Sequence, residues 1–189
     1  YFYNELMNAI PDSYEKTVAK VFDDCTRKYN YTDSEWCKTT WGYDGFKSNN
    51  AFAINNRVII PCYIANPNSY GTQIPAIFNN IAGIKNKDDL KYQGEIYKAI
   101  TNHCKKFETE HFLISTFKKG TMHIYFKNKK HLAMFNYMAG RGKSWLGEGF
   151  ADKPYDDMND SEKEIVRVLG FEPEDFKQMQ LQNKREYIK

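Results

Sequence analysis

Two short segments of β-forming residues, separated by a basic turn, constrain the fold of this chain more than any other feature. They read HFLISTF over residues 111–117 and TMHIYF over residues 121–126, with Lys118, Lys119 and Gly120 between them. Strand-forming runs joined by a short glycine-containing connection are typical of a β-hairpin. The chain therefore contains at least one antiparallel strand pair.

The second strand of this hairpin has two chemically different sides. Successive side chains of a strand point to opposite faces of the sheet, which groups Met122, Ile124 and Phe126 on one face. We expect that apolar face to pack in the core. His123 and Tyr125 then lie on the other face and are the better candidates for a functional surface.

The hairpin leads into a helix, and other elements precede and follow it. Apolar residues at helical spacing predict a helix from Lys129 to Ala139, with Asn128 as its N-cap and Gly140 directly after its end. The remaining expected elements are helices over 13–28, 73–82, 88–106 and 161–169, a helix from near Pro173, and another hairpin over 51–64 that turns at Asn55-Asn56. Together they predict an α+β fold, in which an antiparallel sheet of two hairpins packs against helices and a helical C-terminal segment follows.

Composition sets the number of domains and the class of protein. With 189 residues and 41% hydrophobic content, the chain is long enough for one well-buried core. We predict a main domain over 1–147 and an acidic helical segment over 148–189. The four cysteines form no C-x-x-C pair, which favours reduced thiols in a cytoplasmic protein. The sequence has no apolar run of transmembrane length and no export leader, so we expect no membrane partner.

Charge is strongly segregated along the chain. Residues 111–147 contain seven lysines or arginines, three of the four histidines and no acidic residue. Residues 148–175 contain ten acidic and three basic residues, a net charge of −7. A basic segment with interspersed aromatic residues favours contact with nucleic acid or another polyanion. The alternative is a solvated basic hairpin edge that discourages aggregation.

A Gly-Lys-Ser sequence at residues 142–144 resembles the end of a phosphate-binding loop. Such a loop needs a glycine five positions earlier, where this chain has Tyr137. The loop must also follow a strand and open a helix, whereas Gly142 follows a predicted helix. We therefore expect no nucleotide cofactor.

Two separated motifs resemble an uncharacterised family known as domain of unknown function 4942. The segment FKKGTMHIYFKNKKHLAMFNYMAG (117–140) is similar to the family pattern F-K-N-G-N-x-H-L-x-F at Phe117, Lys118, Gly120, His123 and Phe126, followed by a helix with an L…N…A ending. The segment FKSNNAFAINNRVII (46–60) is similar to a second element at Lys47, Asn49, Phe52, Ile54 and Arg57. The resemblance implies a phage, plasmid or other mobile-element origin and an association with adenine-specific DNA methyltransferases. It names no reaction.

These observations favour a nucleic-acid-binding accessory module in DNA modification, replication or defence, with DNA as the expected partner and a methyltransferase or other protein as a second. The expected binding residues are Lys47, Asn49, Arg57, Lys118, Lys119, His123, Tyr125, Lys127, Arg141, Lys143 and Trp145. Alternatively, Asn49 shapes a turn, and Arg57 is a structural ion-pair partner.

Two other functions remain open from the sequence. A metal-dependent nuclease would use His123 as general acid or base, although no motif typical of a metal site is present and we expect no metal. A protein-interaction module would act through the acidic C-terminal segment, which is also able to compete with nucleic acid for the basic hairpin. The chain lacks a methyltransferase core, because NPNSY (66–70) departs from the Asn-Pro-Pro-aromatic pattern.

Overall fold

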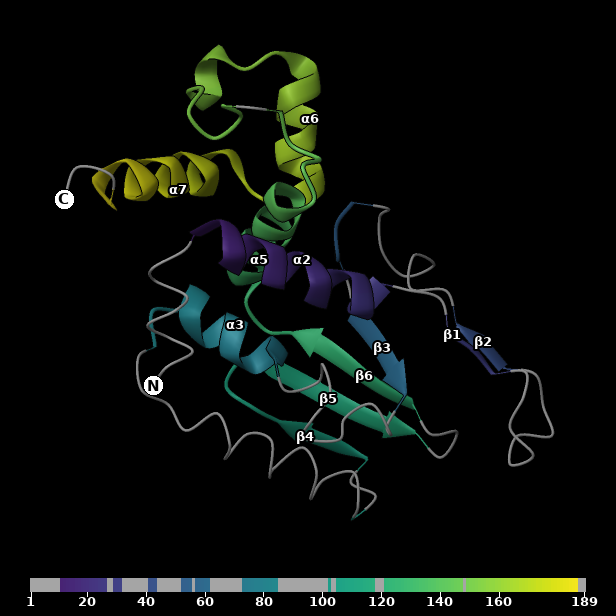
Figure 1. Ribbon diagram of the computed structural model, residues 1–189. Helices are drawn as coiled ribbons and strands as arrows, with labels where there is room; N and C mark the ends of the chain where they lie inside the picture. Colours follow the sequence, from purple (N-terminus) through teal and green to yellow (C-terminus); the bar gives the residue numbers. More distant parts are fainter. Residues whose placement is uncertain are drawn as a thin grey trace.

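A computed structural model places a four-stranded sheet beneath three helices, with further helices beyond them (Figure 1). The structure describes residues 11–26, 29–31, 41–43, 52–55, 57–61, 73–84, 102, 105–117, 121–147 and 149–186. The predicted α+β class is confirmed.

The sheet is antiparallel, and the predicted hairpin forms its centre. Its strands are β3 (Arg57–Pro61), β4 (Lys106–Glu108), β5 (Phe112–Phe117) and β6 (Thr121–Phe126), in the order β3-β6-β5-β4. Strands β1 (Tyr29–Tyr31) and β2 (Trp41–Tyr43) form a separate two-stranded ribbon. The central hairpin thus carries a partner strand on each side.

Three helices cover one face of the four-stranded sheet: α2 (Pro11–Thr26), α3 (Gln73–Ile81) and α5 (Lys129–Gly142) (Figure 1). The largest fully buried side chains between these layers include Phe22, Phe78 and Phe135. Met122 and Ile124 are buried in the same cluster, and Phe126 packs against it, as their alternation predicted. The opposite face of the sheet carries a mixture of polar, aromatic and aliphatic residues, among them His123, Tyr125 and Ile59.

The C-terminal region is helical, as predicted, and packs on α5 away from the sheet (Figure 1). It contains a short 3-10 helix η4 (Tyr155–Asp157) and the helices α6 (Asp160–Leu169) and α7 (Pro173–Glu186). Asn159 and Glu162 form a capping box at the start of α6, and Gly170 ends it at a φ of 97°. A second buried cluster joins this region to Ala133 and Tyr137 of α5.

The predicted hairpin over 51–64 is wrong in its pairing. Strand β3 forms as expected, but it pairs with β6. Ile54, in the expected first strand, instead bonds through its backbone N–H and C=O to the Asn136 side chain of α5. The helix predicted over 88–106 lies mostly outside the described residues, and Lys106 begins β4.

Candidate functional site

The face of the sheet opposite the helices, which we call the outer sheet face, gathers residues from all four strands. Its registers place Arg57 opposite Tyr125 and His123 opposite Ser115. Because side chains alternate along each strand, the same face carries Ile59, Leu113, Phe117, Lys106 and Glu108.

Three aromatic rings lie next to one another on this face. The Phe117 ring is 46% exposed, and its centroid lies 4.3 Å from that of His123. The Tyr125 ring lies 6.5 Å from His123 on its other side. His123 therefore supports two flanking rings, of which Phe117 is the more solvent-exposed.

A guanidinium group lies beside the last of these rings. Arg57 of β3 donates a hydrogen bond of 3.1 Å from Nη1 to the hydroxyl oxygen of Tyr125. Its Cζ atom is 5.8 Å from the centroid of the Tyr125 ring, within the range of a cation–π contact. Cross-strand pairing thus holds a permanent positive charge next to an aromatic surface.

The surroundings of His123 disfavour its charged form. Burial lowers the pKa of its imidazole below the ordinary value, and the nearby positive charge of Arg57 lowers it further. Its Nδ1 atom is buried and has no hydrogen-bond partner among the described residues. These features favour a role for His123 in positioning the neighbouring rings over a role in exchanging protons with a substrate.

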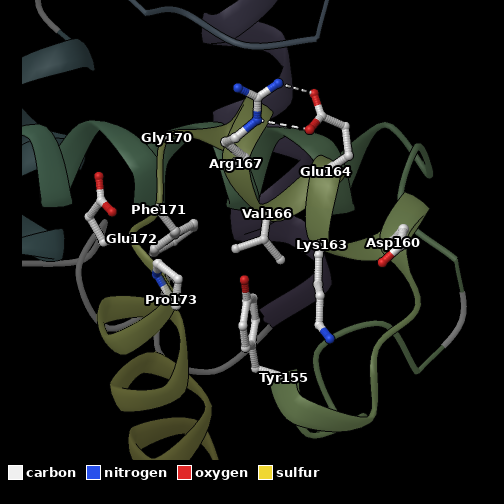
Figure 2. A pocket seen from close by; sticks show the side chains of 10 residues that line it. All are labelled: Tyr155, Asp160, Lys163, Glu164, Val166, Arg167, Gly170, Phe171, Glu172 and Pro173. Carbon is white, nitrogen blue, oxygen red and sulfur yellow. Dashed lines mark hydrogen bonds and ion pairs between the residues drawn. The ribbon is translucent and has the colours of Figure 1, made fainter.

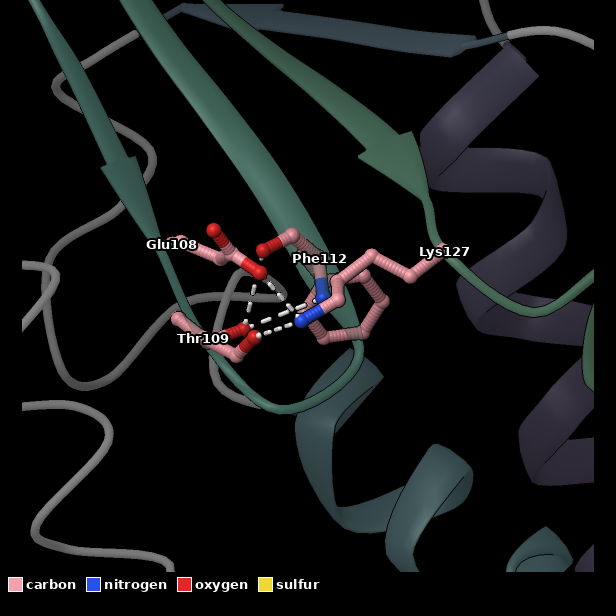
Figure 3. Close-up of polar contacts among 4 residues, drawn as sticks. All are labelled: Glu108, Thr109, Phe112 and Lys127. Atoms are coloured by element: carbon pink, nitrogen blue, oxygen red, sulfur yellow. Dashed lines mark hydrogen bonds and ion pairs between the residues drawn. The ribbon is translucent and has the colours of Figure 1, made fainter.

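Lys127 lies directly after the end of β6, and its ammonium group has both an ion-pair partner and a hydrogen-bond acceptor. It forms an ion pair with Glu108 and donates a 3.1 Å hydrogen bond to the backbone oxygen of Thr109 (Figure 3). Thr109 and Phe112 also bond to each other across the β4–β5 turn (Figure 3). Lys127 therefore ties the end of the hairpin to the edge strand.

The remaining predicted residues, Arg141, Lys143 and Trp145, lie on the helix side of the sheet, on what we call the α2–α5 surface. Arg141 pairs with Glu15 at 3.1 Å, and Lys143 pairs with Asp23, both from α2. The Lys143 ammonium lies 4.8 Å from the centroid of Trp145.

The rings of the α2–α5 surface stand edge to face. Trp145 makes T-shaped contacts with Phe22 at 5.7 Å and with Phe52 at 5.3 Å. Phe22 is fully buried, whereas Phe52 is 56% exposed. Trp145 is thereby attached to the core through Phe22.

The Gly-Lys-Ser sequence serves packing at the end of a helix. Helix α5 continues past Gly140 to Gly142, so the predicted end at Gly140 is wrong. A Cβ atom at Gly142 would lie 2.2 Å from the backbone oxygen of Glu15, so glycine there allows the close contact of α2 and α5. The exclusion of a phosphate-binding loop agrees with this position, because such a loop begins a helix.

The structure divides the predicted binding residues between two surfaces. It brings Arg57, His123 and Tyr125 together on the outer sheet face, places Lys127 at one end of that sheet, and puts the other described candidates on the α2–α5 surface. Lys47, Asn49, Lys118 and Lys119 lie outside the described residues. Phe117 and Lys106 also lie on the outer sheet face but were not among the predicted binding residues.

Acids from other parts of the chain neutralise much of the basic segment. Lys127 pairs with Glu108, Lys130 with Asp175, Arg141 with Glu15, and Lys143 with Asp23. Of these acids, only Asp175 belongs to the acidic C-terminal segment. The charge counted over residues 111–147 therefore overstates the charge available to a polyanion.

Asn136, part of the helix motif, has a structural role. It is 1% exposed, and its side chain bonds to the N–H and C=O of Ile54 and to the C=O of Leu169, at 2.9, 2.9 and 3.0 Å. A buried amide with these partners satisfies backbone groups from two distant segments. Asn136 thus joins the segment before β3 to the end of α6.

A pocket of about 420 Å³ lies in the C-terminal region between α6 and the start of α7 (Figure 2). Val166 and Phe171 are its buried apolar residues, and Arg167 makes two hydrogen bonds to Glu164 at its rim (Figure 2). Its charged lining residues are Lys163, Arg167, Asp160, Glu164 and Glu172. Two cations against three carboxylates disfavour an anionic ligand.

In the described part of the chain, no group of three or more His, Cys, Asp or Glu side chains is arranged to hold a metal ion. The Cys25 thiol is free and buried, and burial raises its pKa, which makes it a poor nucleophile. None of the described helices combines the length and apolar character needed to span a membrane.

Comparison with known proteins identifies the family. The chain belongs to the family described as Domain of unknown function (DUF4942), whose model matches residues 1–145. The match covers the sheet, α2, α3 and α5 together with the α2–α5 surface, and ends before the C-terminal helices. No curated protein and no solved structure matches the chain.

Proposed function

We propose that this member of the DUF4942 family binds nucleic acid, with DNA as the expected partner, through its outer sheet face. The observation that carries the proposal is the row of Phe117, His123 and Tyr125 beside Arg57. Aromatic side chains on an open sheet stack on bases, and a neighbouring cation neutralises phosphate.

Stacking is the larger of the two contributions at this surface. Alanine substitution of a stacking ring costs about 1–3 kcal/mol per base. The described cations of the outer face and its end are Arg57, Lys106 and Lys127, and Lys127 is paired with Glu108. Lys118 and Lys119, which were also expected to bind phosphate, lie outside the described residues.

The α2–α5 surface is not included in the proposed binding site. Arg141 and Lys143 already face Glu15 and Asp23, so a phosphate would have to displace a carboxylate. The net charge of these four side chains is zero. We expect them to contribute to the fold and little to binding.

The proposal describes an accessory module with no reaction of its own. The mobile-element context, the link to DNA modification, replication or defence, and a methyltransferase partner rest on the family resemblance. A cytoplasmic location is part of the proposal, supported by the free Cys25 thiol. The rival functions are a metal-dependent nuclease and a protein-interaction module acting through the acidic segment.

The test is binding of fluorescein-labelled 20-nucleotide DNA, measured by fluorescence anisotropy with the full chain. The test variant is Phe117→Ala, and the matched control is Phe52→Ala, which removes a similarly exposed phenylalanine from the α2–α5 surface. We expect Phe117→Ala to weaken binding about fivefold or more, which corresponds to about 1 kcal/mol or more. Phe52→Ala should bind like the wild type.

Each endpoint is also incubated with Mg²⁺ and run on a denaturing gel. Cleavage that disappears in His123→Ala would favour the nuclease. Equal losses in Phe117→Ala and Phe52→Ala, with both variants folded by circular dichroism, would contradict the assignment to the outer sheet face. Absence of binding by the folded wild type at low salt would reject nucleic acid as a ligand.

A further inference from the structure

We infer that the ligand of the outer sheet face is single-stranded, with one base stacked on Phe117 and a second on Tyr125. This inference rests on the proposed function and specifies its ligand. It comes from the kind of groups that the face offers and from their spacing across two strands.

The groups that we propose to contact the ligand are the rings of Phe117 and Tyr125. In a duplex, the faces of the bases are covered by stacking, and the grooves present only base edges. A protein ring therefore reaches a base face only where the base is unstacked, as in a single strand, a loop or an end. Phe117, nearly half exposed, is available for such a contact.

The outer sheet face is separate from the face that the helices cover. Helices α2, α3 and α5 bury residues such as Val18, Ile77 and Phe135 against the inner face of the sheet. On the outer face, Phe117 is exposed, whereas Ile59 is buried.

The rings define two positions with His123 between them. His123 lies 4.3 Å from Phe117 and 6.5 Å from Tyr125. The side of Phe117 away from His123 and the exposed part of Tyr125 are the surfaces for bases, and Arg57 stands beside Tyr125 for the phosphate of that nucleotide. His123 acts as a positioning residue.

Charge supports the same choice of ligand. Among the described residues, the strands of the outer face present two cations, Arg57 and Lys106, against one carboxylate, Glu108, and Lys127 at the end of β6 is paired with that carboxylate. With so few cations, stacking on the rings has to supply much of the affinity, as it does in the binding of single strands.

The experiment compares three labelled DNA ligands of equal length with the full-length protein: an oligothymidine single strand, the same strand paired with oligoadenine, and a strand whose central nucleotides are abasic. The abasic strand keeps every phosphate and removes the bases. We expect the single strand to bind at least tenfold more tightly than either of the other two.

Variants at Tyr125 separate stacking from hydrogen bonding. Tyr125→Phe keeps the ring and loses the hydroxyl that Arg57 binds, so we expect it to retain most of the single-strand affinity. Tyr125→Ala should lower that affinity about fivefold or more while leaving binding to the abasic strand unchanged. Thermal unfolding of each variant confirms that it is folded.

The outcomes separate the two proposals. Duplex binding equal to or tighter than single-strand binding, or equal affinity for the abasic strand, would overturn the single-strand inference and leave nucleic-acid binding in place. Failure of all three ligands to bind would reject both proposals together.

Discussion

The outer sheet face and the α2–α5 surface both combine aromatic rings with cations, but the two surfaces use them differently. On the outer sheet face, Phe117 is half exposed and its ring lies on His123. On the α2–α5 surface, Lys143 is paired with Asp23, and Trp145 stands against the buried Phe22. The number of basic residues in a sequence segment therefore does not give the charge that a surface presents to a ligand. That charge depends on the acidic residues from elsewhere in the chain that pair with the basic ones.

Asn136 carries the largest expected effect, because it joins the segment before β3 to the end of α6. Asn136→Ala leaves the N–H and C=O of Ile54 and the C=O of Leu169 buried without this partner. At about 1–3 kcal/mol for each unsatisfied group, we expect a loss of about 3 kcal/mol or more in the free energy of unfolding, measured by urea denaturation.

The matched control is Asn128→Ala at the N-terminus of the same helix. Asn128 is an exposed N-cap that accepts hydrogen bonds from the N–H groups of Lys130 and His131, and its loss should cost about 1 kcal/mol. Equal losses in the two variants would mean that the buried bonds of Asn136 contribute no more than an ordinary cap.

Gly142 tests the structural role of the α2–α5 surface. In Gly142→Ala, the new methyl group meets the backbone of Glu15, so α2 and α5 must separate. We expect a loss of about 1–3 kcal/mol of stability, with single-strand DNA affinity unchanged in conditions where the variant is folded. Gly147→Ala, which meets no atom within 4 Å, should change stability by less than about 0.5 kcal/mol. A weaker DNA affinity in Gly142→Ala would place this surface in the binding site.

A salt series compares one cation from each surface. Each phosphate neutralised on a single strand contributes about −0.7 to the slope of log affinity against log salt concentration. We expect Arg57→Ala to make the slope shallower by about that amount and Lys143→Ala to leave it unchanged, because Lys143 faces Asp23. The opposite pattern would exchange the roles of the two surfaces.

The pH dependence of stability gives the smallest expected effect. Burial and Arg57 lower the pKa of His123, and burial lowers the pKa of His131. The unfolded chain then binds these protons more tightly than the folded protein, so the contribution to stability is present above about pH 6.5 and is lost as the pH falls toward the lowered pKa.

We therefore expect the melting temperature to fall between pH 7.5 and pH 5, and to fall less in His123→Gln. His131→Gln, on the helix side, should reduce the acid dependence independently, so that the double variant shows the smallest change. An acid dependence that is identical in all four proteins would contradict the proposed burial of these two imidazoles.

Local signals in the sequence were sufficient for much of the fold. Strand alternation predicted β5, β6 and the inward Met122 and Ile124, and helix signals predicted the N-cap Asn128 and the stop at Gly170. These features depend on residues a few positions apart, whose preferences act within one turn or one strand. The basic and aromatic composition of the hairpin is likewise a local property, so it can be read from the sequence without knowing what surrounds the hairpin in the fold.

Contacts between distant residues were decided only by the tertiary structure. Asn136 bonds to Ile54, 82 positions away, and replaces the strand pairing that the local sequence predicted. Lys143 meets Asp23 across 120 positions, which separates it from Arg57 although both were expected at one site. The sequence by itself determined most of the elements and the alternation of side chains along β5 and β6. The tertiary structure determined which charges are paired, because a charge is neutralised by its neighbours in space and not by its neighbours in the chain.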